Sequence, residues 1–257
     1  PRIVIQKKFS GFSLNIGKAI IKNAELNKPA FFLYYSFMPK LFVVATPIGN
    51  LNDITFRAIE TLKSVDFILA EDTRVAKKLL AHLGVSKPTF SFREHTSAKA
   101  LEKITYFLKK AHSAALVTDA GTPGVSDPGQ RLIKAVKDFM EIVPITGPSA
   151  LAAIVSARDI DLGQFIFTGF PPHKKGRQKF FKQINDYKLP IILFESPHRI
   201  QKTLSELEKY CGDRYVNIGR ELTKIYEEIF RGTLSEAQKH FTDERRRGEF
   251  VIVVDLN

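Results

Sequence analysis

A chain of 257 residues is long enough for one large domain or two smaller α/β domains, and its 44% hydrophobic and 26% charged residues are typical of soluble globular proteins. No apolar run approaches the roughly 20 residues that cross a bilayer, which argues against a membrane protein. The one cysteine, Cys211, excludes an intramolecular disulfide framework and a cysteine-rich zinc site, because both need several thiols. We therefore expect a cytoplasmic protein without a metal.

Basic residues outnumber acidic ones, 39 to 27, which gives a formal net charge of +12. Residues 1–40 contain seven bases and one acid, a net charge of +6, which leaves +6 for residues 41–257. An excess of this size favours an anionic partner such as RNA or an acidic membrane surface. It suits a solubilising surface equally well, so charge alone does not decide the partner.

The first 37 residues lack the alternation of strands and helices that follows, and their apolar stretch 30–37 (AFFLYYSF) is too short to span a membrane. Residue 1 is proline and Met38 directly precedes the first convincing strand, which suggests that Met38 is the natural start. A basic, acid-poor targeting segment is the alternative, although its single arginine, Arg2, argues against it. We expect residues 1–40 to be an extension outside the functional body.

From Leu41 onward, apolar strands alternate with amphipathic helices. Strands are expected at 41–45, 66–70, near Phe90, at 114–118 and at 141–145, and helices at 53–63, 74–83, 98–110, 130–139 and 149–157. This alternation indicates a parallel sheet that is covered on both faces. The sequence therefore predicts an N-terminal α/β domain over residues 41–158.

The apolar pattern breaks at residues 158–163 (RDIDLG) and then resumes. Five further strands are expected at 165–169, 190–194, 215–219, 225–232 and 250–256, and helices at 175–187, 197–210 and 235–241. The neighbouring strands 225–232 and 250–256 suggest some antiparallel pairing. We predict a C-terminal α/β domain with a mixed sheet over residues 159–257.

The densest signal is the loop 119–129 (DAGTPGVSDPG), which lies between an expected buried strand and a helix. Its three glycines and two prolines fix an unusual backbone path and leave main-chain groups unscreened by side chains. Open α/β sheets bind ligands at the carboxyl ends of their strands, where this loop belongs. A ligand-binding role is therefore favoured over a rigid structural turn.

Two more loops, 46–50 (TPIGN) and 146–150 (TGPSA), follow strands that should end on the same edge of the sheet. In the second of them, Pro148 is expected in the first turn of a helix, with the N–H groups of Ser149 and Ala150 free for an anionic group. None of the three loops has the pattern GxxxxGKT or GxGxxG, so a nucleoside triphosphate or NAD is disfavoured. We expect the three loops to converge on a ligand held mainly by backbone groups.

Polar clusters stand at the ends of four further expected strands, at 71–74 (EDTR), 93–96 (REHT), 195–199 (ESPHR) and 220–224 (RELTK). Each cluster mixes acids with bases. Such residues are typical either of a functional site at the strand ends or of local ion pairs on the surface. His95 and His198 lack a second histidine or cysteine at ligand spacing, which disfavours a metal.

A basic segment at 172–182 (PHKKGRQKFFK) opens the second domain. Its bases suit either contact with a nucleic-acid backbone or a solvated helix face, while Phe180 and Phe181 are expected to face the core.

Seven motifs, taken in order, resemble one family. They are TPIGNLNDIT (46–55), AEDTR (70–74), DAGTPGVSDPG (119–129), GPSA (147–150), ESPHR (195–199), RELTK (220–224) and GEFVIVV (248–254). Together they resemble the ribosomal RNA small subunit methyltransferase I family, within the tetrapyrrole methylase superfamily. The resemblance runs from Leu41 to the C-terminus.

The resemblance implies a class III S-adenosylmethionine methyltransferase with two α/β domains, a cofactor in the cleft between them and a homodimeric state. It implies methyl transfer to the ribose 2′-hydroxyl of a cytidine in 16S ribosomal RNA, free or in the assembled small subunit. The cofactor positions it implies are Pro47, Asp119, Gly121, Thr122, Pro123, Gly124, Val125, Ser126, Pro148, Ser149 and Ala150. A tetrapyrrole carbon methylase and a non-catalytic RNA-binding module are the competing functions.

This chemistry needs an aligned hydroxyl and a group that takes its proton. The candidate proton acceptors are Glu71, Asp72, Glu94, His95 and Glu221. The candidate RNA phosphate contacts, chosen for their charge and donors, are Arg74, Arg199, Arg220, Lys224, Lys174, Lys175 and Arg177.

The sequence departs from the family pattern at a few positions. Arg93 and Thr96 replace a common histidine and asparagine, Thr146 replaces a common proline, and Ala157 and Arg158 replace a small residue and a glycine. The missing imidazole at Arg93 removes one expected side chain from that loop.

Overall fold

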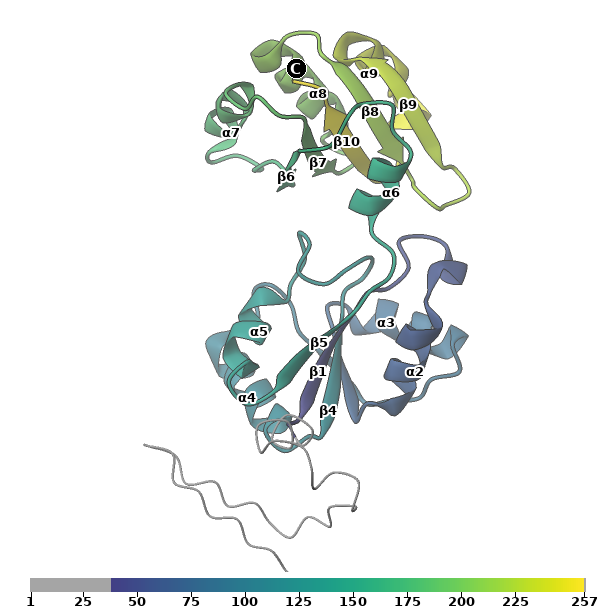
Figure 1. Ribbon diagram of the computed structural model, residues 1–257, viewed down its shortest axis with the longest axis vertical. Coiled ribbons are helices and arrows are strands. Elements are labelled where there is room, and N and C mark those ends of the chain that lie inside the picture. Colours follow the sequence, from purple (N-terminus) through teal and green to yellow (C-terminus); the bar gives the residue numbers. More distant parts are fainter. Residues whose placement is uncertain (1–37, 257) are drawn as a thin grey trace, which may run out of the picture. The chain divides into compact units, whose positions relative to one another are not determined.

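A computed structural model describes residues 38–256 (Figure 1). The expectations for residues 1–37 lie outside the described residues. Within residues 38–256, no helix is both long enough and apolar enough to cross a membrane.

The first sheet has five strands, and every pairing in it is parallel. The strands are β1 (Lys40–Val44), β2 (Phe67–Ala70), β3 (Thr89–Ser91), β4 (Ser113–Val117) and β5 (Glu141–Ile145). Their order is β3-β2-β4-β1-β5, so β1 lies between β4 and β5. The loops after these three strands therefore leave neighbouring positions on one edge of the sheet.

Helices cover both faces of this sheet, as the sequence predicts (Figure 1). They are α2 (Phe56–Ser64), α3 (Thr73–His82), α4 (Ala98–Leu108) and α5 (Gln130–Val136), and a short 3₁₀ helix η2 (Leu51–Asp53) precedes α2. Successive strand residues point to opposite faces. Leu116 therefore packs with Leu108 and Leu132 on one face, while Val117 packs with Leu62 and Leu80 on the other.

The helix starts are set by side-chain caps. Thr55 accepts a hydrogen bond from the N–H of Ala58, and Ser97 accepts one from the N–H of Ala100. Helix α2 begins at Phe56 and not at the expected residue 53, because Asn50 caps η2 and the chain is extended at Ile54 before it enters α2. Such caps satisfy N–H groups that have no partner inside the helix.

The second sheet is mixed. Its strands are β6 (Ile166–Gly169), β7 (Ile191–Glu195), β8 (Tyr215–Arg220), β9 (Glu228–Thr233) and β10 (Phe250–Val254), in the order β6-β7-β10-β8-β9. Only β6 and β7 pair in parallel, and the other pairs are antiparallel. The expected antiparallel pairing is present, but β9 and β10 do not pair with each other because β8 lies between them.

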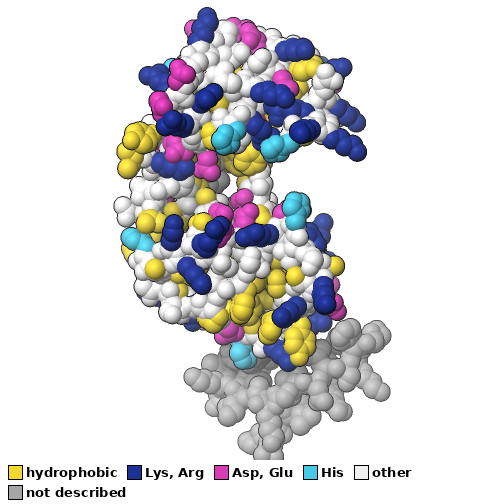
Figure 2. All heavy atoms as spheres, turned by 180° about the vertical axis from the view of Figure 1, so that it is seen from behind, with side chains coloured by type: hydrophobic (Ala, Val, Ile, Leu, Met, Phe, Trp, Pro, Cys, Tyr) yellow, Lys and Arg dark blue, Asp and Glu magenta, His cyan; other side chains and the backbone are white. Residues whose placement is uncertain are grey.

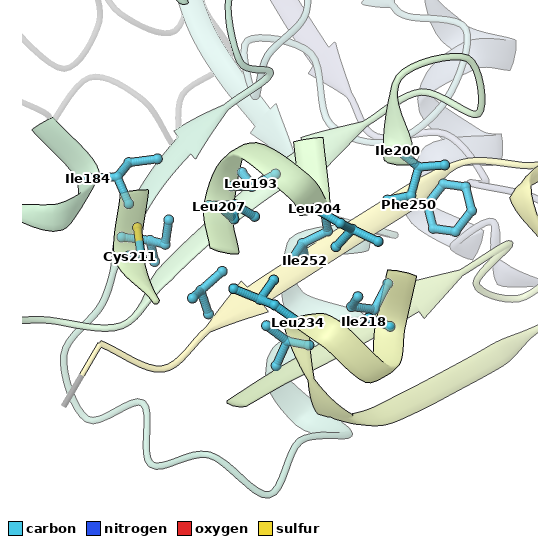
Figure 3. Close-up of a cluster of buried hydrophobic side chains, with 14 of the residues drawn as sticks. Ile184, Leu193, Ile200, Leu204, Leu207, Cys211, Ile218, Leu234, Phe250 and Ile252 are labelled. Carbon is cyan, nitrogen blue, oxygen red and sulfur yellow. The ribbon is translucent and has the colours of Figure 1, made fainter. Parts of the chain in front are cut away.

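Three helices, α7 (Arg177–Asn185), α8 (Ile200–Cys211) and α9 (Leu234–His240), cover one face of the second sheet, and a 3₁₀ turn η3 (Asp243–Arg246) follows them. Leu204 and Leu234 pack against Ile218 and Ile252 in the core between sheet and helices (Figure 3). Burial of each such side chain contributes roughly 1.5–3 kcal/mol.

The opposite face of the second sheet is covered partly by helix α6 (Ala150–Ser156), where Ile154 packs with Val251 and Val253. A Cβ added to Gly219 on β8 would lie 3.1 Å from Ile154 Cδ1, so a glycine allows this close approach. The sequence pattern predicts residues 149–157 as part of the N-terminal domain, yet this helix packs on the second sheet. The two-sheet α/β fold class is confirmed, while the boundary at residue 158 stays a prediction.

Candidate functional site

The three predicted loops meet at the carboxyl edge of the first sheet. The N–H of Thr46 donates to the carbonyl of Gly121 at 2.9 Å, and the N–H of Gly121 donates back at 3.0 Å. The hydroxyl of Thr122 donates to the carbonyl of Pro148 at 3.2 Å. These contacts join the loops after β1, β4 and β5, which confirms the predicted convergence.

The loop 119–129 follows an unusual backbone path. Gly121 and Gly124 have φ values of 79° and 89°, and Ser126 is a non-glycine residue with φ of 62°. This left-handed region is easily reached by glycine and costs energy for other residues. The loop therefore holds a strained conformation at Ser126, which is a common property of ligand-binding segments.

Gly169, at the end of β6, lies against this loop. A Cβ added to Gly169 would be 2.6 Å from Ser126 Oγ, and the φ of Gly169 is itself 65°. Both the space and the backbone conformation at this position therefore require glycine. The contact brings the end of a strand of the second sheet to the glycine-rich loop.

The start of helix α6 differs from the prediction. The structure gives Ser149 the N-cap position and begins the helix at Ala150, so Pro148 lies before the helix and not in its first turn. The extended backbone of Ser149 delays the helix by one residue. Pro148 contributes its carbonyl oxygen to Thr122 instead.

A cavity of about 190 Å³ lies beside the loop after β1. Its walls are mostly apolar, and Thr46, Thr118 and Asp119 supply polar groups. The hydroxyl of Thr46 donates to the carbonyl of Thr118 at 3.2 Å, which joins the ends of β1 and β4. Pro47, one of the expected cofactor residues, also lines this cavity. Ligand sites commonly combine apolar walls with a few placed polar groups in this way.

Asp127 is not among the site residues predicted from the sequence. Burial raises its pKa to about 7, and the negative charges of Glu71 and Asp119 act in the same direction. The pKa of Glu71 is also raised, first by burial and then by the charge of Asp119. Carboxyl groups that share a partly buried site resist joint ionisation. The second aspartate of DAGTPGVSDPG was the available sequence signal for Asp127.

Asp72 has a structural role at the start of α3. Its carboxylate accepts hydrogen bonds from the N–H of Arg74 at 2.8 Å and from the Arg74 side chain at 2.5 Å. These bonds lower the pKa of Asp72 well below its usual range. Asp72 is therefore a poor proton acceptor, and Arg74, although exposed, is already paired.

The loop 93–96 is held by bonds within itself and to α5. The hydroxyl of Thr96 accepts from the N–H of Arg93 at 2.8 Å, and Arg131 donates to the carbonyls of Glu94 and Thr96 at 2.7 and 3.0 Å. The side chains of Glu94 and His95 are exposed. The two unusual residues, Arg93 and Thr96, thus bond to each other.

Glu221 and Lys224 form a closed cluster with Glu249. Lys224 Nζ lies 2.8 Å from Glu221 Oε1 and 2.9 Å from Glu249 Oε2. Burial acts to raise the pKa of Glu221, but the hydrogen bonds from Lys224 and from the N–H of Glu249 outweigh it and hold the pKa below its usual value. Glu221 is therefore poorly suited to take a proton.

This cluster also contacts the loop after β1. The N–H of Asn50 donates to the hydroxyl of Thr223 at 3.1 Å, and a Cβ on Gly49 would lie 2.3 Å from Lys224 Cγ. The loop segment 221–224, which follows β8, thus lies against the segment 49–50 in the loop after β1. Residues from RELTK and TPIGN, far apart in the sequence, are neighbours here.

Three of the arginines expected to contact RNA phosphates are mostly buried. The side chains of Arg177, Arg199 and Arg220 are 5%, 14% and 12% exposed, and each pairs with a glutamate. Arg220 also donates to the carbonyl of Arg247 at 2.7 Å. Direct phosphate contact by these three arginines is not supported by the structure, because their guanidinium groups are engaged inside the protein. Sequence reasoning could not locate their partners.

Lys174 and Lys175, in contrast, are exposed. Figure 2 shows Lys and Arg side chains gathered over the side of the second sheet that carries α7. Among residues 38–256, no group of three or more His, Cys, Asp or Glu side chains is arranged to hold a metal ion.

A family model and several solved structures match the chain that carries these loops. Residues 40–238 match the model of the Tetrapyrrole (Corrin/Porphyrin) Methylases. Two solved structures share the fold: a diphthine synthase, with a TM-score of 0.61 and 15% identity over 83% of this chain and 89% of that one, and the cobalt precorrin-4 methyltransferase CbiF, with a TM-score of 0.58 and 18% identity over 83% and 94%. The fold and family match together define a methylase of the class III type.

Relatives with higher sequence identity identify the family within the tetrapyrrole methylases. A protein of Thermotoga maritima named Ribosomal RNA small subunit methyltransferase I is 43% identical over 84% of this chain and 98% of its own length. A protein of the same name from Bacillus subtilis is 44% identical over 86% of this chain and 76% of its own length. The chain therefore belongs to the ribosomal RNA small subunit methyltransferase I family, within the tetrapyrrole methylases, and it is an enzyme of the methyltransferase class.

Proposed function

We propose that this protein transfers a methyl group from S-adenosylmethionine to the ribose 2′-hydroxyl of a cytidine in small-subunit ribosomal RNA. The observation that supports this most strongly is the convergence of the 46–50, 119–129 and 146–150 loops in a chain whose relatives carry an RNA methyltransferase name.

The chemistry of the converging loops fits the cofactor. S-adenosylmethionine supplies an already activated methyl group. The residues that would hold it are Pro47, the loop 119–126 and the segment 148–150, which offer backbone groups and a carboxylate at Asp119. Of these residues, Pro47 and Asp119 also line the apolar cavity beside the loop after β1. Close approach of a ligand to backbone is possible at Gly121 and Gly124, which carry no side chain.

The remaining task for the protein is to align the ribose hydroxyl and take its proton as the new C–O bond forms. Asp127 suits the second role better than the five acceptors named from the sequence, because its pKa of about 7 allows it to be ionised before the reaction and to bind a proton well afterwards. Burial is the main cause of that raised pKa, and the negative charge of Glu71 adds to it. Asp72 and Glu221 are held ionised by their basic partners.

The basic surface beside α7 suits the phosphate backbone of the substrate, since Lys174 and Lys175 have free access to solvent. The substrate is free small-subunit RNA or the assembled subunit, and we place the enzyme in the cytoplasm as a homodimer. Sedimentation velocity of the purified protein tests the last point.

Mass spectrometry tests the reaction. Purified enzyme is incubated with S-adenosylmethionine and small subunits that lack the modification, and the digested RNA is searched for 2′-O-methylcytidine. Asp127→Asn serves as the matched control, because it keeps the shape and removes the proton-accepting carboxylate. Methylation of a base contradicts the ribose assignment. Absence of methylation in a preparation that binds the cofactor favours a tetrapyrrole substrate or a non-catalytic role.

A further inference from the structure

A buried polar network lies beneath the basic segment of the second sheet. The carboxylate of Glu195, at the end of β7, is fully buried and lies 2.7 Å from Arg199 Nη2. Its other oxygen accepts from the hydroxyl of Thr203 at 2.6 Å, and this hydroxyl in turn accepts from Arg177 Nη2 at 2.7 Å. Arg177 also donates to Glu206 at 2.7 Å. Thr203 is thus the link that joins the two arginines through one carboxylate.

Both arginines use a remaining N–H group to hold the same loop. Arg199 Nη1 donates to the carbonyl of Pro171 at 2.8 Å, and Arg177 Nη1 donates to the carbonyl of Pro172 at 3.0 Å. The loop 170–176 leaves β6 at Gly169 and enters α7 at Gly176, and both glycines have left-handed backbones with φ of 65° and 82°. Two adjacent carbonyls are therefore fixed by buried guanidinium groups.

The same loop carries His173, Lys174 and Lys175, all of them exposed. A surface loop with two adjacent lysines would ordinarily sample many conformations, and binding an anion would then cost the entropy of ordering it. The two clamped carbonyls remove much of that freedom before any ligand arrives. The network thus restrains the backbone that leads directly into the two lysines.

We propose that the network formed by Glu195, Thr203, Arg177 and Arg199 positions Lys174 and Lys175 for contact with the phosphate backbone of the RNA substrate, so that Arg177 and Arg199 are positioning residues and the two lysines touch the RNA. This inference rests on the proposed RNA function. It assigns to the buried arginines a role in RNA binding that does not require them to reach the solvent.

The energetics favour a positioning role. Removing charges from water is costly, and well-packed apolar residues often stabilise a protein as much as a buried ion pair does. Arg177, however, makes three hydrogen bonds that set its geometry, and its guanidinium also lies 5.0 Å from the centre of the Phe181 ring. Directed bonds of this kind fix the course of a backbone, which apolar packing does less specifically.

The test removes one hydroxyl. Thr203→Val keeps the volume of the side chain but breaks the link between Glu195 and Arg177, while Thr203→Ser keeps the hydroxyl. Binding to a small-subunit RNA fragment is measured at several salt concentrations for each variant, with and without the double substitution Lys174→Ala and Lys175→Ala. Cofactor affinity is measured by calorimetry in parallel.

When Lys174 and Lys175 are replaced and Thr203 is left unchanged, we expect the plot of log affinity against log salt concentration to become less steep. The change in slope should correspond to the loss of about two phosphate contacts. Thr203→Val should weaken RNA binding roughly tenfold and leave cofactor affinity unchanged. Removing the lysines in that background should add little further loss. Thr203→Ser should restore the wild-type slope.

Additive losses from Thr203→Val and the lysine substitutions would overturn the positioning role, as would wild-type RNA binding by Thr203→Val. An unchanged salt slope after lysine removal, in a protein that still binds the RNA, would overturn the role of the loop. Failure of the wild-type protein to bind the RNA at all would contradict the proposed function instead.

Trypsin cleavage after Lys174 and Lys175 supplies a readout without RNA, because a released loop should be cut faster in Thr203→Val than in Thr203→Ser. If Thr203→Val does not fold, Glu206→Gln tests the same network at a residue whose side chain is 23% exposed. It should produce a smaller loss of RNA affinity in the same direction, and a wild-type affinity would count against the proposal.

Discussion

The backbone N–H of Asp72 donates a hydrogen bond of 3.0 Å to the Oδ1 of Asp119. This bond joins the end of β2 to the start of the loop 119–129, so the carboxylate of Asp119 fixes one side of the site as well as offering charge to a ligand. The negative charge of Asp119 also contributes to the raised pKa values of Glu71 and Asp127.

Replacing Asp119 by alanine should therefore weaken cofactor binding about tenfold, since loss of one hydrogen-bonded anchor costs roughly 1–1.5 kcal/mol. Asp119→Asn keeps an oxygen for the N–H of Asp72 and should lose less. Isothermal titration with S-adenosylmethionine measures both. Equal affinity of Asp119→Ala and the wild-type protein would remove Asp119 from the cofactor site.

The rate of methyl transfer should rise with pH through about 7, because the pKa of Asp127 lies there and only its ionised form accepts a proton. Asp127→Asn should lower the rate strongly and abolish this inflection, while cofactor affinity changes little. Single-turnover rates measured between pH 5.5 and 8.5 would reveal the inflection. If the inflection persists in Asp127→Asn, it arises from another titratable group.

The same residue should make stability depend on pH. The pKa of Asp127 is raised by folding from 3.8 to about 7, so the folded state binds a proton more tightly than the unfolded state. Its contribution to stability is therefore complete below pH 4 and is lost as pH rises from about 4 to about 7.

Asp127→Asn cannot ionise and should raise the melting temperature relative to wild type at pH 8, with little difference at pH 4. Thermal melts at the two pH values check this. A larger gain at pH 4 than at pH 8 would show the opposite linkage.

Gly169→Ala should destabilise the protein by about 1–2 kcal/mol, because it introduces a Cβ at a left-handed position and against Ser126. Adding Ser126→Gly removes the obstructing hydroxyl and relieves the backbone at residue 126, so the double variant should recover part of the loss. Chemical denaturation measures the free energies of unfolding. Strict additivity of the two changes would mean that the contact carries no energy.

Arg199→Ala should destabilise the protein by about 3 kcal/mol, because it leaves the fully buried carboxylate of Glu195 without its cation. The exposed Lys188 is the control, and Lys188→Ala should change stability by less than about 0.5 kcal/mol. A normal melting temperature for Arg199→Ala would contradict the assignment of Arg199 as the cation that compensates the buried carboxylate of Glu195.

Local sequence patterns predict the type and order of the elements and the positions of the main loops, although the starts of α2 and α6 differ from the prediction. The apolar strands and their alternating helices define a parallel sheet, and a parallel sheet brings the ends of β1, β4 and β5 to one edge. The convergence of the residues around Thr46, Gly121 and Pro148 followed from that geometry, with help from the family resemblance.

Local sequence patterns do not predict which side chains, far apart in the sequence, contact each other in the fold. Arg177 and Arg199 look like any surface arginine in sequence, and only the fold places Thr203 and Glu195 against them. The raised pKa of Asp127 likewise depends on its burial in the fold and then on the charge of Glu71, which follows a different strand. The apolar face of residues 150–156 was recognisable, but not the sheet on which it packs.

The position of β10 has a consequence for biosynthesis. This strand occupies the centre of the second sheet, hydrogen-bonded to β7 on one side and β8 on the other, although it is the last strand among residues 38–256. Until residue 254 has left the ribosome, β7 and β8 have no strand between them, so the second sheet forms only after translation passes that point. The first sheet needs nothing beyond residue 145 and is free to fold earlier, from its own strands, while the nascent chain is still growing.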